Sequence, residues 1–210
     1  WSMPVRYLSD VAEHEAVRTS AGLFDLSHMA EIIVSGDDAA ALLDYALVGR
    51  ASGLALGRAG YSLMCAQDGG VIDDVIVYRR DHDYFMVVAN AANRDAVLSE
   101  LWARREAYPA GDGSCQAALS DETESLALIA VQGPDSADIV ARRCQRGDDD
   151  GHALKYYSAA NVVLKGGVHA YVARTGYTGE DGFELFVGAD VAQDVWALAV
   201  ETGGEALTLC

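Results

Sequence analysis

The sequence has few cysteines, lysines and prolines, and these shortages exclude several classes of protein. Its 210 residues include four cysteines and three prolines, and only Lys155 and Lys165 are lysines. The cysteines are far apart and form no Cys-x-x-Cys pair, so we expect free thiols in a reducing compartment and no disulfide framework. The five histidines lack the spacing of metal ligands, and we therefore expect no bound metal.

Long apolar runs and basic stretches are absent as well. No run reaches the roughly 18 apolar residues of a membrane-spanning helix, and the first residues lack the basic and apolar segments of a secretory signal. The formal net charge of −17 at pH 7 would repel nucleic-acid phosphates and anionic lipids. We therefore expect no nucleic acid and no membrane as partner, and a cytoplasmic location, or the mitochondrial matrix in a eukaryote.

The hydrophobic pattern of the chain occurs twice. Hydrophobic residues make up 51% of the sequence, which is enough for the core of one or two domains. A strand at 30–34 is followed by a glycine turn, a helix, a hairpin, a strand and a helix, and the same order begins again at 126–131. Such a repeat is too long for a solenoid. We therefore predict an α+β fold of two related halves, with mixed or antiparallel sheets and flanking helices.

Several segments have no counterpart in this repeat. Residues 8–21 are predicted to form a helix that Ser9 caps, with acidic residues near its start. The other segments are predicted to be connections, extended at 23–29 and 156–157, looped at 108–117, with an acidic loop at 147–151.

Two adjacent carboxylates lie inside an apolar strand that follows the Gly69-Gly70 turn. Successive strand residues point to opposite faces, so Asp74 shares a face with Ile76 and Asp73 points away from both. Burying a carboxylate is costly unless it has a partner, and such groups often serve a function. The alternative is structural: one aspartate is solvated and the other binds a backbone group beside the Gly69-Gly70 turn.

A glycine-rich loop leads into a second strand that carries a carboxylate. Three glycines fall within seven residues of segment 174–184, which also contains Tyr177, and Glu184 lies on the strand that follows. The loop is acidic and no helix follows it, so it does not fit a phosphate-binding loop. One interpretation is a recognition loop whose acidic groups bind a donor-rich heterocycle while Tyr177 stacks on the ring. The other is an acidic turn in which Tyr177 packs locally.

A set of segments carries a family resemblance that covers essentially the whole chain. The segments are Trp1–Tyr7, Glu13-His14, Ala16–Arg18, Gly22–Met29, Gly69–Asp74, Val88–Ala91, Val131–Pro134 and Thr175–Glu184. In order and spacing they resemble the T-protein family, the aminomethyltransferases of the glycine cleavage system. The resemblance implies the folate-binding fold of that family, and we expect residues 1–29 and 118–210 to form one domain with 30–117 inserted as a second.

The resemblance also implies a reaction. A lipoyl-bearing H-protein carries an aminomethyl group on sulfur, tetrahydrofolate accepts the methylene as co-substrate, ammonia leaves, and the dihydrolipoyl H-protein remains. The implied activity is that of a one-carbon transferase in glycine catabolism. Its partners would be the H-protein and a small-molecule folate.

Site residues follow from the same resemblance. Asp74 matches the family's essential aspartate near the folate nitrogens, where a carboxylate holds N10 and offsets positive charge during the transfer. Tyr177 and Glu184 match the positions at which members of the family bind the pterin ring. The other matching positions that line the folate pocket are Met29, Tyr61, Ile76, Tyr78, Asn90 and Tyr157.

The resemblance covers only the N-terminal part of the longer sequences of the family. Members continue past the equivalent of 207–210 into a segment with an arginine for the glutamate tail of folate, and then into a C-terminal barrel. We therefore expect a fragment that lacks the barrel and whose own activity stays open. The missing arginine would cost about 1.5–3 kcal/mol, roughly one to two powers of ten in folate affinity.

Two other functions remain open for this folate-binding module. One is a non-catalytic or formaldehyde-capturing module of a dimethylglycine or sarcosine oxidase-like protein. The other is a tetrahydrofolate-dependent demethylase. An adjoining flavin domain would favour the oxidase, whereas a neighbouring lipoyl carrier would favour glycine cleavage.

Overall fold

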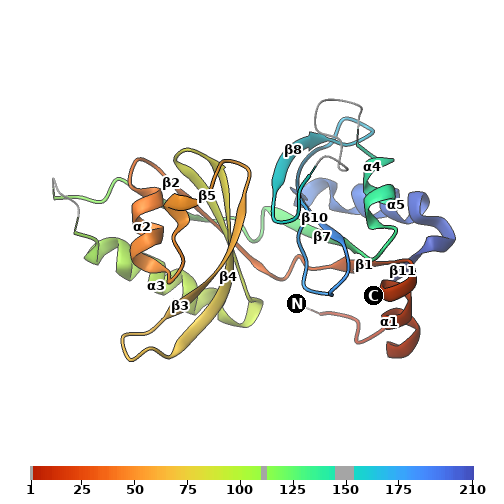
Figure 1. The fold of residues 1–210 in the computed structure, drawn as a ribbon, viewed down its shortest axis with the longest axis horizontal. Helices are drawn as coiled ribbons and strands as arrows, with labels where there is room; N and C mark the ends of the chain where they lie inside the picture. Colours follow the sequence, from red (N-terminus) through yellow and green to blue (C-terminus); the bar gives the residue numbers. More distant parts are fainter. Residues whose placement is uncertain (1, 110–112, 145–153) are drawn as a thin grey trace. The chain divides into compact units, whose positions relative to one another are not determined.

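The chain forms two compact units. The computed structural model describes residues 2–109, 113–144 and 154–210, so the acidic loop expected at 147–151 lies outside the described residues. The first unit comprises Trp1–His28 and Ser125–Cys210, and the second unit comprises Met29–Glu124 (Figure 1). The boundary falls after Glu124 and not at residue 117, because strand β6 (Ala118–Asp121) pairs with β2 (Ala30–Ser35) inside the second unit.

The unit Met29–Glu124 is an antiparallel sheet with two helices packed on one face (Figure 1). Its other elements are α2 (Ala39–Ala46), η1 (Ala51–Gly53), β3 (Ala59–Cys65), β4 (Val71–Asp81), β5 (Tyr84–Ala89), η2 (Ala91–Asn93) and α3 (Arg94–Ala107). The strand order is β3-β4-β5-β2-β6. Alternate strand residues such as Val75 and Val77 form the core with Leu42 and Leu101 of the helices. The period-two pattern thus sets the face that the helices cover.

The unit Trp1–His28 with Ser125–Cys210 is a mixed sheet. Its elements are α1 (Asp10–Thr19), β1 (Ala21–Asp25), β7 (Leu126–Gln132), α4 (Ser136–Ala141), β8 (Ala159–Val163), β9 (His169–Ala173), β10 (Gly182–Gly188), η4 (Ala189–Val191), α5 (Ala192–Gly203), η5 (Gly204–Ala206) and β11 (Leu207–Leu209). The strand order is β11-β1-β7-β10-β9-β8, and only β1 and β11 pair in parallel among the described strands. Residues of α4 and α5 pack with alternate residues of the sheet.

The two units repeat one topology, as the sequence pattern predicted. The series β2-α2-β3-β4-β5-α3-β6 corresponds to β7-α4-β8-β9-β10-α5-β11, and β1 is the extra strand, placed between β7 and β11. Equivalent glycines turn the chain into α2 and α4: Gly36 has φ 111° and Gly133 has φ 136°. A Cβ would lie 2.2 Å from the Gln116 carbonyl oxygen at the first position and 2.4 Å from that of Ser20 at the second. The α+β prediction is confirmed.

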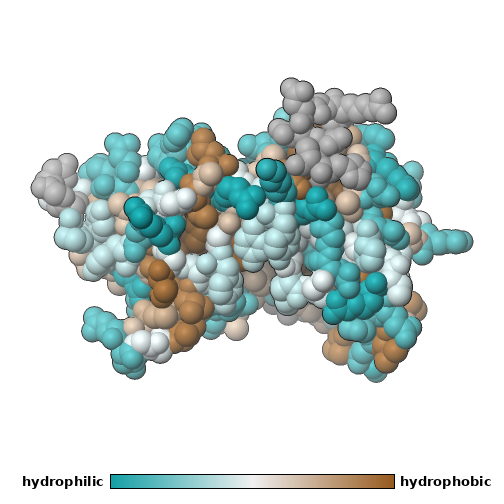
Figure 2. Space-filling view, in the orientation of Figure 1, coloured by the Kyte–Doolittle hydropathy of each residue, from teal (hydrophilic) through white to brown (hydrophobic). Residues whose placement is uncertain are grey.

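Three short strands and one turn differ from the predictions. Part of the predicted connection 23–29 belongs to β1, and neither β6 nor β11 was predicted. Tyr156 and Tyr157 form a turn and not an extended piece, with Tyr157 in the left-handed region at φ 58°. The predicted cap of α1 is confirmed, because the Ala12 amide donates to the Ser9 hydroxyl at 3.1 Å. Figure 2 shows hydrophilic residues over much of the visible surface, in keeping with the net charge of −17.

Candidate functional site

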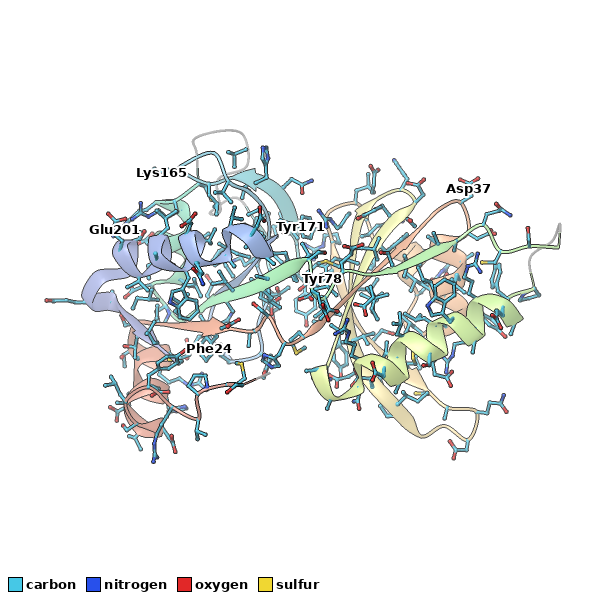
Figure 3. All side chains as sticks on the ribbon, turned by 180° about the vertical axis from the view of Figure 1, so that it is seen from behind. Phe24, Asp37, Tyr78, Lys165, Tyr171 and Glu201 are labelled. Carbon is cyan, nitrogen blue, oxygen red and sulfur yellow. The ribbon has the colours of Figure 1, made fainter. Side chains whose placement is uncertain are left out.

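A pocket of about 140 Å³ opens on the sheet of the first unit. Its floor is a row of three residues on adjacent strands, because Ala130 of β7 pairs with Phe24 of β1 on one side and Glu184 of β10 on the other. Figure 3 labels Phe24, the member of this row that β1 contributes. These residues face away from the core formed with α4 and α5. The small Ala130 side chain leaves space between its larger neighbours. The complete lining is Phe24, Leu26, Ala130, Gln132, Gly176, Tyr177, Thr178 and Glu184.

The glycine-rich loop at the pocket is closed at its base by an ion pair. Arg174 donates to both carboxylate oxygens of Asp181, at 2.9 and 2.6 Å. The carbonyl of Asp181 accepts the Gly133 amide at 2.7 Å, which ties the loop to the turn before α4. A bidentate arginine–carboxylate pair fixes the relative orientation of the two side chains as well as their distance. The ends of the loop that carries Tyr177 and Thr178 are therefore fixed by the ion pair and by this hydrogen bond.

Gln132 holds the inner side of this loop and was missed as a site residue. It is 3% exposed, its Nε2 donates to the Thr175 carbonyl at 3.0 Å, and its Oε1 accepts from the Thr178 hydroxyl at 3.1 Å. A Cβ on Gly176 would lie 2.1 Å from Oε1, and one on Gly182 would lie 2.2 Å from the same amide. Gly176 and Gly182 have no room for a larger residue, because the buried Gln132 side-chain amide occupies the space that a Cβ would take at both positions. A polar residue that ends an apolar strand just before Gly-Pro was the available signal.

Tyr177 and Glu184 line the same pocket with opposite degrees of exposure. Tyr177 is 91% exposed at the loop, whereas Glu184 is half-buried on β10 and accepts a hydrogen bond from the Thr175 hydroxyl. A carboxylate with several acceptor positions can bind ring N–H groups and still keep this bond. The exposed ring of Tyr177 has an open face for stacking. The pocket therefore suits a flat, donor-rich ring.

Tyr157 lies at the base of the same loop. Its amide donates to the Arg174 carbonyl at 2.9 Å, and its ring meets that of Tyr156 edge to face at 4.8 Å between centroids. Among the described residues it is the only one besides glycine with a positive φ. A non-glycine residue in this conformation is strained, and such strain is concentrated at functional sites.

In the second unit the two carboxylates of β4 point to opposite faces, as predicted. Asp73 is 3% exposed on the face of Val75 and Val77, whereas Asp74 is exposed on the other. Asp73 accepts three hydrogen bonds: from the Asn90 amide at 2.9 Å, from Asn90 Nδ2 at 2.9 Å and from Asn93 Nδ2 at 2.6 Å. The structural alternative thus describes Asp73, and its backbone partner follows β5 and is not at the glycine turn.

Asp74 shares its face with two aromatic residues. Tyr61 pairs with Ile76 across β3 and β4 and is 57% exposed, while Tyr78 is only 1% exposed. Desolvation, followed by the charge and the hydrogen bond of the Asp74 carboxylate, raises the pKa of the Tyr61 hydroxyl. Asn90 Nδ2 also donates to Asp74 Oδ1 at 3.0 Å. The exposed carboxylate is therefore held by two neighbouring side chains.

The structure places the predicted site residues in two groups, one in each unit. Tyr177 and Glu184 line one pocket of the first unit, and Tyr157 lies at the base of the loop. The members from the second unit are Asp74, Tyr61, Ile76 and Tyr78 on the paired strands β3 and β4, Asn90 directly after β5, and the half-buried Met29 just before β2. Among the described residues, no cluster of histidine, cysteine or acidic side chains could hold a metal ion, and no described helix is long and apolar enough to cross a membrane.

Comparisons with known proteins agree over the whole chain. The sequence model of the GCVT N-terminal domain matches residues 1–209. An aminomethyltransferase of Cutibacterium acnes is 46% identical, with 100% of this chain and 56% of that protein covered. An aminomethyltransferase of Streptomyces avermitilis is 49% identical, with 98% of this chain and 52% of that protein covered. The chain thus spans about half the length of the curated relatives it matches.

Solved structures give the same result. The crystal structure of glycine cleavage system aminomethyltransferase T from Bartonella henselae matches with a TM-score of 0.85 and 32% identity, covering 100% of this chain and 53% of that one. A heterotetrameric sarcosine oxidase from Corynebacterium matches with a TM-score of 0.64 and 15% identity, covering 93% of this chain and 91% of that one, a likeness of fold alone. With a domain match over nearly every residue and relatives of this identity, the chain belongs to the GCVT N-terminal domain family.

Proposed function

We propose that this chain is the folate-binding part of a tetrahydrofolate-dependent aminomethyltransferase of glycine cleavage. The observation that carries the proposal is identity of 46–49% over almost the whole chain to proteins named aminomethyltransferase. In the reaction, the carbon–sulfur bond of an aminomethyl-lipoyl group breaks and the methylene becomes bonded to N5 and N10 of tetrahydrofolate. Ammonia is released and the lipoyl group is left as a dithiol.

The pocket of the first unit supports a role in holding the pterin. We assign Glu184 as the acceptor of pterin N–H groups and Tyr177 as the ring that stacks on the pterin. Gln132 keeps the loop in place through Thr175 and Thr178. Tyr157 supports the base of that loop through Arg174.

The exposed carboxylate of the second unit supports a role in the transfer itself. We assign Asp74 to hold the N10 region and to offset the positive charge that develops on the methylene, which is the effect of a fixed charge beside a cationic transition state. The other residues that we assign to the folate site from this unit are Met29, Tyr61, Ile76, Tyr78 and Asn90.

The donor and the location are finer parts of the same proposal. We propose a lipoyl-bearing H-protein as donor, because the Bartonella henselae structure is named as part of the glycine cleavage system. None of the four cysteines forms a disulfide, which fits the reducing cytoplasm. The likeness to sarcosine oxidase concerns the fold alone and does not favour an oxidase module.

The test is Asp74→Asn in the complete encoded polypeptide. The variant should fold and bind tetrahydrofolate, because Asp74 lies on the face away from the core, but aminomethyl transfer should fall by at least about 100-fold. Asp95→Asn, an exposed site at the start of α3, is the matched control. Transfer that survives in Asp74→Asn would refute the role of Asp74. Folate binding without transfer in the wild-type protein would refute the enzyme and leave a binding module.

A further inference from the structure

Asp73 is a buried carboxylate that the transfer reaction, as described so far, does not use. It lies on the apolar face of β4, where a valine would continue the row of Val75 and Val77. None of the ion pairs among the described residues includes it, and its three hydrogen-bond donors come from Asn90 and Asn93 alone. A buried carboxylate that only asparagines satisfy costs more than an apolar residue of similar size. The arrangement therefore calls for a reason beyond packing.

The Asn90 side chain connects this buried carboxylate to the exposed one. Its single nitrogen, Nδ2, donates to Asp73 Oδ1 at 2.9 Å and to Asp74 Oδ1 at 3.0 Å, with the Asp74 carbonyl at 3.3 Å. Three acceptors around one atom fix that atom as the nitrogen, because a rotated amide would place its oxygen against two carboxylates. Both hydrogens of the amide are thus engaged, and only its oxygen is left for a ligand.

Two further hydrogen bonds, one of them from the main chain, fix the position of the Asp73 carboxylate. The Asn90 amide group of the main chain donates to Asp73 Oδ2, and Asn93 donates to Asp73 Oδ1 from the last position of η2. Asp73 is therefore held between the end of β5 and the start of α3. Within the part of the chain that the structure describes, the Asp74 carboxylate has the strand backbone, this amide and Tyr61 to set its direction.

We propose that Asp73 is a positioning residue that orients the Asp74 carboxylate through the Asn90 side chain, an inference that rests on the proposed function. When Asp73 becomes asparagine, one of its two oxygens becomes an NH₂ group that faces N–H donors. The Asn90 amide then loses an acceptor and is free to rotate away from Asp74. Misplacement of a reacting group by about 1 Å costs on the order of 100-fold in rate.

The experiment compares Asp73→Asn with Asp95→Asn in the complete encoded polypeptide. We expect the transfer rate constant of Asp73→Asn to fall about 10- to 100-fold, while KM for tetrahydrofolate changes less than about threefold. A double-mutant cycle with Asp74→Asn separates positioning from general damage. If Asp73 acts through Asp74, adding Asp73→Asn to Asp74→Asn should change the residual single-turnover rate by less than about threefold.

Each outcome decides the matter. An unchanged rate in Asp73→Asn, or an equal loss with and without Asp74, overturns the inference and leaves the proposed function intact. No transfer by the wild-type protein overturns the proposed function before any variant is compared. If Asp73→Asn does not fold, Asn90→Ala carries the same test, because the amide of residue 90 and Asn93 still satisfy Asp73. Because Asn90 is also assigned to the folate site, its single-turnover rates are compared at saturating tetrahydrofolate. Asn90→Ala should then show the same non-additive loss with Asp74→Asn, and additive losses would overturn the inference.

Discussion

Replacing Glu31 by glutamine should stabilise the protein at alkaline pH. Glu31 lies on β2, it is fully buried, and neither of its carboxylate oxygens has a hydrogen-bond partner among the described residues. Arg94, the cation whose charge acts on Glu31, is already bound by Asp121 through two hydrogen bonds of 2.9 and 2.7 Å. Burial, and then the charge of Asp121, raises the pKa of Glu31 from 4.5 to about 8, against a smaller opposing effect of Arg94.

The sign and size of the effect follow from linkage. A carboxyl group whose pKa is higher in the folded state binds its proton more tightly there, so folding is opposed increasingly as the pH rises from 4.5 to 8. The full penalty above pH 8 is about 5 kcal/mol, at 1.36 kcal/mol for each unit of the shift. Between pH 5.5 and 8.5 the penalty grows by about 3 kcal/mol. Glutamine carries no charge and should not show this growth.

The assay is denaturant unfolding of the wild type and Glu31→Gln at pH 5.5 and 8.5, with hydrogen exchange of β2 amides to follow the second unit by itself. The advantage of the variant should increase by about 3 kcal/mol from the lower to the higher pH. Glu106→Gln, an exposed glutamate of α3 in the same unit, is the control. A difference that stays constant with pH, as expected for Glu106→Gln, would refute the account of Glu31.

Two further changes test the pocket of the first unit. Gly176→Ala would place a Cβ 2.1 Å from Gln132 Oε1 at φ 152°, so the loop must move, and tetrahydrofolate affinity measured by calorimetry should fall at least about tenfold. Unaltered affinity would show that the loop does not hold the folate, and Gly113→Ala, where nothing lies near the new Cβ, reports the cost of positive φ alone. Ala130→Leu should fill the space between Phe24 and Glu184 and abolish folate binding, at a cost of about 1–3 kcal/mol in stability because Ala130 is 1% exposed, whereas retained binding would place the pterin elsewhere.

The repeated pattern and the faces of the strands could be predicted because they depend on local sequence. Alternation around Asp73 and Asp74 indicated opposite faces, and the glycines before α2 and α4 marked equivalent turns. Strand β11 has three residues and forms by parallel pairing with β1, a contact between distant parts of the chain that leaves no periodic signal. The same limit applies to β6, which was assigned to the wrong side of the domain boundary.

Side-chain partnerships were harder to predict than faces. The role of Gln132 depends on two glycines that approach it from a later part of the chain. The turn at Tyr157 depends on backbone hydrogen bonds with Arg174, and sequence propensity disfavours a tyrosine at positive φ. In both cases tertiary contacts override a local preference, and the sequence pattern contains only one of the partners.

On these strands one face packs in the core and the other carries the site residues, which explains why polar site residues are compatible with the sheets. On β10, Phe183 and Leu185 belong to the core while Glu184 between them lines the pocket. On β4, Val75 and Val77 belong to the core while Asp74 points away from it. A carboxylate on the face away from the helices does not disturb the packing that stabilises the unit. Asp73 breaks this division, since it is a carboxylate on the core side, and its contacts lead through Asn90 to Asp74 and not to a cation. The exception therefore lies where the proposed chemistry needs a fixed direction.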